Sequence, residues 1–185
     1  AAGAALKWAR EAFYPGKTYA ELDQLAAGSP PGANGVRFYP HLAGAASPLW
    51  QATARGAFTG LSLAAGPADI VRSVLEGIAF QIRANLAVMA TLAPVEELVL
   101  FGGGARSALW AQIIAEATGL PAFVAEMVDV ANWGACLLAG AGVGLCPDRL
   151  AGLGATCEPS PAAIARYDGI YQEYIAGEKN LIGTR

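Results

Sequence analysis

The chain has 185 residues, which suits a single domain, and it combines 55% apolar residues with only 15% charged ones. So low a charge content predicts that part of the surface is covered by a partner domain or subunit. The formal net charge of −3 and the lack of a basic stripe exclude the electrostatic pattern of a nucleic-acid binder.

Histidine and cysteine usage gives no pattern of a metal site. His41 is the only histidine, and Cys136, Cys146 and Cys157 form neither a CxxC pair nor a zinc knuckle. Three cysteines without a disulfide framework favour a reducing compartment, so we expect a cytoplasmic protein. The opening residues lack a basic leader, and no signal peptide is expected.

The first part of the chain is predicted to form two helices and two short strands. Pro15 and Gly16 end the first helix. A capping-box pattern, Thr18 followed three residues later by Glu21, starts the second. The predicted elements are a helix over residues 3–14, a helix that ends at residue 27, and strands over 36–39 and 57–63, with a long loop over 41–55.

The longest helix is predicted to begin at Gly66-Pro67, because proline suits a first helical turn. Its apolar residues recur every four positions and predict a stripe central to the core. These residues are Ile70, Val74, Ile78, Ile82 and Leu86. Glu76 lies beside the stripe and needs a partner, because burying an unpaired carboxylate is costly. We expect it to cap or bridge a neighbouring loop, since a general base would need an adjacent substrate pocket that the sequence does not show.

Strands and helices alternate after Pro94, which favours an α/β domain with a largely parallel portion. A charge-free stretch from Val130 to Pro147 is rich in glycine, which favours a closely packed soluble helix over a membrane span. Its small residues predict core packing rather than ligand contact. The predicted elements are strands over residues 97–101 and 122–124, helices over 107–118 and 130–141, and helices that begin at Pro147 and Pro161, the last reaching Ala176.

A glycine-rich turn, Gly102-Gly103-Gly104, links the strand over residues 97–101 to the next helix. Glycine lets the backbone approach a ligand closely, and the free N–H groups of a helix start attract phosphate. Arg106 adds positive charge. The turn lacks the Lys-Ser/Thr ending of a Walker loop and is not GxGxxG. On these residues alone, a phosphate-binding turn and a purely structural turn stay equally open.

Several motifs in this order resemble the FGGY carbohydrate kinases, most closely their xylulokinase branch. The segment from Gly56 to Glu76 is similar to the family's C-terminal signature, and Gly102 to Trp110 resembles its Gly-Gly-Gly-x-x-Ser-x-x-Trp nucleotide loop. The opening residues, the Tyr-Pro-His-Leu-Ala-Gly stretch and the small-residue helix from Val130 resemble further family segments. The resemblance covers nearly the whole chain.

The resemblance implies an α/β fold, an actin-like (ribonuclease-H-like) lobe with a mixed sheet and flanking helices. Residues 1–185 would form one C-terminal nucleotide-binding lobe that uses ATP with Mg²⁺. In the family, the N-terminal lobe supplies the catalytic aspartate and most sugar contacts, so the chain alone is expected to be inactive. The implied nucleotide residues are Gly3 and Lys7 near the phosphates, Gly102, Gly103 and Gly104 around phosphate or ribose, and Ser107 towards the adenosine.

The implied activity is phosphorylation of a sugar hydroxyl, with xylulose or a related ketose as the expected substrate. Kinases of glycerol, ribulose or gluconate stay open as alternatives, as does a non-catalytic nucleotide-binding or regulatory module. The expected partners are ATP or ADP, the absent lobe and a small sugar bound through it, with a homodimer as a further option. Two departures from the family weaken the substrate assignment or alter packing: Ala45-Ala46 in place of Glu-Arg, and Asn132-Trp133 in place of smaller residues.

Overall fold

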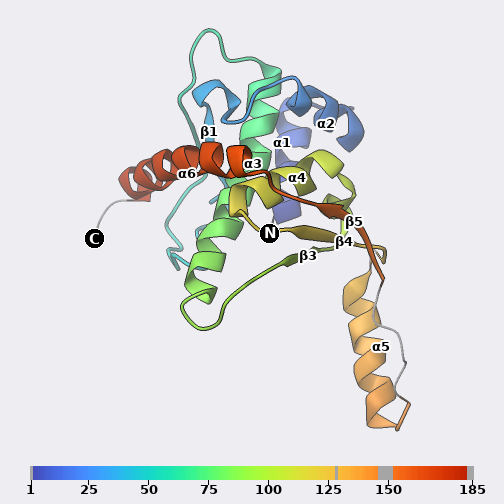
Figure 1. The fold of residues 1–185 in the computed structure, drawn as a ribbon. Helices are drawn as coiled ribbons and strands as arrows, with labels where there is room; N and C mark the ends of the chain where they lie inside the picture. Colours follow the sequence, from blue (N-terminus) through green and yellow to red (C-terminus); the bar gives the residue numbers. More distant parts are fainter. Residues whose placement is uncertain (1, 128, 146–151, 183–185) are drawn as a thin grey trace.

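The computed structural model describes residues 2–127, 129–145 and 152–182 (Figure 1). In chain order its elements are α1 (Ala2–Phe13), α2 (Tyr19–Ala27), the 3-10 turn η1 (Ala33–Gly35), β1 (Arg37–Tyr39), β2 (Ala57–Thr59), α3 (Pro67–Met89), β3 (Leu98–Leu100), the 3-10 turn η2 (Gly103–Arg106), α4 (Ala108–Thr118), β4 (Ala122–Ala125), α5 (Val130–Gly142), β5 (Leu153–Cys157) and α6 (Pro161–Ile182).

The elements predicted as far as α5 are all present, for the local reasons given by the sequence. The capping box of α2 is formed, because the Thr18 hydroxyl accepts the Glu21 N–H and the Glu21 carboxylate accepts the Thr18 N–H. The second strand is shorter than predicted, since Gly60 turns the chain with a φ of +72°. That left-handed conformation favours glycine and ends the extended segment.

The C-terminal part departs from the prediction. The helix expected from Pro147 starts outside the described residues. β5 was not predicted, because its Leu-Gly-Ala-Thr-Cys sequence has little strand propensity and the strand forms by pairing with β4. α6 begins at Pro161 as predicted but continues to Ile182, beyond the expected end at Ala176.

Two small sheets form the β structure. β1 and β2 pair antiparallel, with Phe38 opposite Phe58. β3 pairs parallel with β4, which pairs antiparallel with β5, so the three-stranded sheet is mixed, as predicted. The parallel pair places the carboxyl end of β3, where the glycine turn starts, beside the end of β4.

The core surrounds α3, as the apolar stripe predicted. Every residue from Val71 to Phe80 is buried, so the middle of α3 is enclosed on all sides rather than along one stripe. It packs against α1, α2, α4 and β1 (Figure 1). Contact with β1 is so close that a Cβ on Gly77 would overlap the Phe38 carbonyl oxygen. α3 therefore supplies the fixed frame on which the other elements rest.

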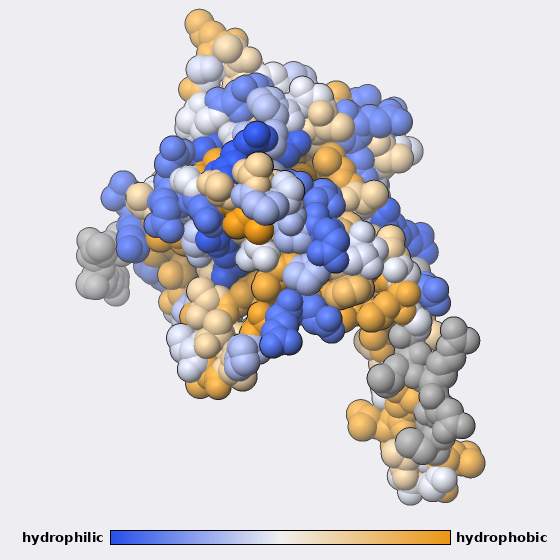
Figure 2. All heavy atoms as spheres, viewed as in Figure 1, coloured by the Kyte–Doolittle hydropathy of each residue, from blue (hydrophilic) through white to orange (hydrophobic). Residues whose placement is uncertain are grey.

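The prediction that the 130–141 helix packs closely against its surroundings is wrong for the residues that the structure describes. α5 projects from the body of the molecule and contains no buried residue (Figure 1). Leu138 is 77% exposed, and Val143 just after the helix is 74% exposed. Figure 2 shows apolar side chains along this projecting arm. Within the described ranges, no helix is both long and apolar enough to cross a membrane.

Candidate functional site

The glycine turn between β3 and α4 has the open backbone that a ligand would require. Gly102 has a φ of +83°, in the left-handed region that favours glycine. A Cβ on Gly102 or Gly103 would meet no heavy atom within 4 Å. A Cβ on Gly104 would lie 2.5 Å from Cζ3 of Trp110, so that glycine is required by packing. The turn is thus open on one side and supported on the other.

A cavity of about 350 Å³ lies against this turn and brings together three of the predicted residues. Gly3 of α1 lines it together with Gly103 and Gly104. The other lining residues are mainly apolar and come from α3, β3, the turn and α4: Ile82, Val99, Leu100, Phe101, Ala105, Trp110, Ala111 and Ile114. The volume falls in the range of small-molecule sites, roughly 300–1,000 Å³.

The other predicted residues do not line the cavity, although each is close in the sequence to a residue that does. They are Lys7, Gly102 and Ser107. Gly102 starts the turn, and Lys7 follows Gly3 by one turn on the same face of α1. The Lys7 amine is exposed and lies 3.9 Å from the Glu11 carboxylate, a contact that contributes little to stability. A larger hollow of about 470 Å³ at the α1–α2 junction contains none of the predicted residues.

Ser107 lies at the start of α4 and acts as its N-cap. Its hydroxyl oxygen accepts the Trp110 N–H at 3.0 Å. Partial burial raises the pKa of Asp23 in α2, and the nearby Ser107 side chain lowers it by less. Sequence reasoning missed Asp23, because nothing in the α2 sequence indicates that it faces the α4 N-terminus.

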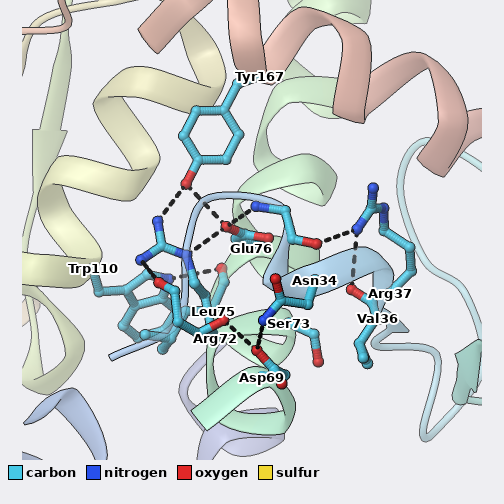
Figure 3. A network of polar contacts seen from close by, with 12 residues as sticks. Asn34, Val36, Arg37, Asp69, Arg72, Ser73, Leu75, Glu76, Trp110 and Tyr167 are labelled. Atoms are coloured by element: carbon cyan, nitrogen blue, oxygen red, sulfur yellow. Dashed lines mark hydrogen bonds and ion pairs between the residues drawn. The ribbon is translucent and has the colours of Figure 1, made fainter. Parts of the chain in front are cut away.

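The Trp110 side chain packs against the glycine turn at Gly104. This side chain is 3% exposed, and its indole Nε1–H donates to the carbonyl oxygen of Leu75 at 3.1 Å (Figure 3). The ring therefore joins the glycine turn to the most buried part of α3.

Glu76, the residue after Leu75, has the structural role expected from the sequence. Its Oε1 accepts the Gly32 N–H at 2.9 Å, Nε–H of Arg72 at 2.8 Å and the Tyr167 hydroxyl at 3.0 Å (Figure 3). Glu76 is 1% exposed. Burial, and then the neighbouring Glu76 carboxylate, raise the pKa of Tyr167, which keeps that hydroxyl protonated as a donor. The network bridges α3 to the loop before η1 and to α6.

Asp69 makes a second bridge between α3 and the same loop. Its carboxylate accepts the Gly66 N–H at 2.9 Å, the Ser29 hydroxyl at 2.6 Å and the Asn34 amide at 2.9 Å. These bonds, the Gly66 N–H first, lower the pKa of Asp69. Both α3 acids are therefore structural, and neither lines the cavity at the glycine turn.

Several known proteins are similar to this chain. A sequence model of the FGGY family of carbohydrate kinases, C-terminal domain, matches residues 1–143. A xylulose kinase from Staphylococcus epidermidis is 34% identical over 145 residues, which cover 78% of this chain and 29% of that protein. A glycerol kinase from Gloeobacter violaceus is 38% identical over 150 residues, which cover 79% of this chain and 30% of that protein.

The fold is also that of a solved kinase. The crystal structure of ligand-bound xylulose kinase from Lactobacillus acidophilus matches 98% of this chain with a TM-score of 0.89 at 24% identity, and this chain covers 38% of it. That match confirms the predicted actin-like fold. The chain spans about 30% of the length of the curated relatives it matches. It belongs to the FGGY family of carbohydrate kinases and matches the C-terminal domain of that family.

Proposed function

We propose that this chain is the nucleotide-binding half of an ATP-dependent carbohydrate kinase. The observation that carries the proposal is the cavity at the glycine turn, where Gly3, Gly103 and Gly104 converge from separate parts of the sequence. Membership of a family of carbohydrate kinases supports ATP as the phosphoryl donor.

The chemistry of the cavity suits a nucleotide. Backbone N–H groups at the glycine turn and the positive end of the α4 dipole attract phosphate, and Arg106 adds charge beside them. The apolar side chains of Ile82, Phe101 and Ile114 offer a surface for the base. In this proposal the ligand approaches the backbone at Gly103, because a Cβ there would meet no neighbouring heavy atom within 4 Å.

Mg²⁺ does not fit the residues of this cavity. It prefers carboxylate and phosphate oxygens, and in the part of the chain that the structure describes no carboxylate lines the cavity. Among the described residues, no group of three or more His, Cys, Asp or Glu side chains is placed to hold a metal ion. In our proposal the ion arrives with the nucleotide phosphates, and any protein ligands for it belong to the other half of the enzyme.

The proposed substrate is xylulose or a related ketose. The Staphylococcus epidermidis xylulose kinase supports it, whereas the glycerol kinase from Gloeobacter violaceus favours a glycerol-type substrate at slightly higher identity. Ala45-Ala46 does not decide between them. Turnover of a complete kinase that contains this chain, measured on xylulose, ribulose, gluconate and glycerol, decides the substrate; a preference for glycerol would refute the ketose assignment.

A second lobe is proposed to complete the enzyme in the cytoplasm. Phosphoryl transfer depends on positioning and charge stabilisation around both the nucleotide and the acceptor. About 70% of the length of each relative lies outside the part that this sequence matches. Leu138 and Val143 on the α5 arm give an exposed apolar surface for that lobe. The catalytic residues are proposed to lie in it.

Two measurements test the proposal. In a coupled assay with ATP and a pentulose panel, the isolated chain is expected to show no turnover; robust turnover would refute the half-enzyme account. In a calorimetric titration with Mg·ADP, the wild-type chain is expected to bind and Gly103→Val to lose binding, because the new side chain fills the ligand space.

A matched control separates loss of the site from loss of the fold. Gly169 in α6 also has nothing within 4 Å of its Cβ position, and it lies outside the cavity. Gly169→Val is expected to bind Mg·ADP like wild type. Equal binding by wild type and Gly103→Val would place the nucleotide elsewhere. No binding by wild type would favour a lobe that needs its partner, or a module that binds no nucleotide.

A further inference from the structure

Trp110 contacts the glycine turn at two points and lines the cavity beside it. A Cβ on Gly104 would lie 2.5 Å from Cζ3 and 3.2 Å from Cε3 of the Trp110 ring. Its main-chain N–H donates to the Ser107 hydroxyl at 3.0 Å, which fixes the exit of the turn. The ring forms part of the cavity wall next to Gly104. The indole therefore sets the distance between the glycine turn and α4.

The indole itself has little freedom to move. It is 3% exposed, and its Nε1–H donates to the Leu75 carbonyl oxygen at 3.1 Å (Figure 3). Leu75 is fully buried in α3 and precedes Glu76, whose Oε1 accepts three hydrogen bonds. The ring therefore holds the glycine turn at a fixed position relative to α3, the most buried helix.

We propose that Trp110 is a positioning residue for nucleotide binding. It holds the backbone of Gly103 and Gly104 in the position from which their N–H groups donate to phosphate. The inference rests on the proposed function. Ligand-binding groups must be held to about 0.5 Å by the packing and hydrogen bonds around them. A turn made of three glycines has no side chains of its own to provide this, so the Trp110 ring provides it.

The first variant removes only the hydrogen bond and the outer ring. Trp110→Phe is expected to raise the Kd for Mg·ADP about tenfold, because the backbone of the turn is no longer held in a fixed position. Ile113→Val is the matched control: Ile113 lies in α4, is 1% exposed and does not line the cavity. That variant also loses stability but is expected to keep the wild-type Kd. A wild-type Kd in Trp110→Phe would overturn the proposal.

A double-mutant cycle tests the contact directly. Gly104→Ala is expected to raise the Kd at least about tenfold in the wild-type background, and by about threefold or less in Trp110→Phe, where the outer ring edge is gone. Equal effects in both backgrounds would show that the ring does not set the turn. If Trp110→Phe does not fold, Gly104→Ala alone tests the same contact, and a wild-type Kd in that variant would overturn the proposal.

Hydrogen exchange of the nucleotide-free chain separates this proposal from the proposed function. Trp110→Phe is expected to speed amide exchange over residues 103–107 at least about tenfold and leave β4 unchanged. If wild type binds no nucleotide yet exchange speeds up in the variant, nucleotide binding by the isolated chain fails and the support of the turn by Trp110 stands. Unchanged exchange at the turn would overturn the positioning role whatever the nucleotide result.

Discussion

Replacing Glu76 with glutamine is expected to destabilise the chain by about 3 kcal/mol. The substitution keeps the shape of the side chain and removes its charge. Three donors meet on one carboxylate oxygen: the Gly32 N–H, the Arg72 guanidinium and the Tyr167 hydroxyl. A hydrogen bond to a charged group contributes about 1 kcal/mol more than a neutral one. The sum agrees with the cost of about 3–5 kcal/mol for breaking a buried ion pair.

Urea unfolding measures this effect, and the chain contains its own control. Arg37 and Glu173 also form a 2.8 Å ion pair, but the Glu173 side chain is 72% exposed. Glu173→Gln is expected to cost at most about 1 kcal/mol, because solvent screens exposed pairs. A loss below about 1 kcal/mol for Glu76→Gln, with an unchanged denaturant dependence, would refute a structural role for the buried network.

Three further predictions concern packing, capping and pH. Gly77→Ala is expected to cost about 3 kcal/mol in urea unfolding, because its Cβ would overlap the Phe38 carbonyl; a neutral effect would contradict the close α3–β1 contact. Ser107→Ala is expected to cost about 1 kcal/mol by loss of the α4 N-cap, whereas Ser107→Asp keeps the cap; equal losses in both would contradict it. The pKa of Asp69 is lowered in the folded state, so its contribution is complete above the usual carboxyl pKa and is lost as pH falls through the folded value. The stability difference between wild type and Asp69→Asn should therefore shrink as the pH falls below the ordinary aspartate pKa of 3.8, and a constant difference would contradict this.

Local signals in the sequence predicted the positions of most elements. The capping box at Thr18, the proline at the start of α3 and the glycine turn after β3 each depend on neighbouring residues only. The role of Glu76 was also predictable, because a carboxylate beside an apolar stripe requires a partner. Its partner Tyr167 was not, since it lies 91 residues away and is brought close only by the packing of α6.

The missed features depend on contacts between distant segments. β5 has four exposed residues out of five, so its sequence carries no alternating apolar pattern. Small residues in α5 permit close packing against any partner, but they do not say whether that partner lies in the same 185 residues. Asp23 lies near Ser107 because α2 packs on α4, a contact that neither helix sequence indicates.

The most direct measurement is a titration of the ¹⁵N-labelled chain with Mg·ADP, followed through its backbone amide resonances. The largest shifts are expected at Gly3, Gly103 and Gly104, the glycines that line the cavity at the turn. Saturating shifts confined to the hollow between Arg10 and Thr18, with none at the turn, would contradict it.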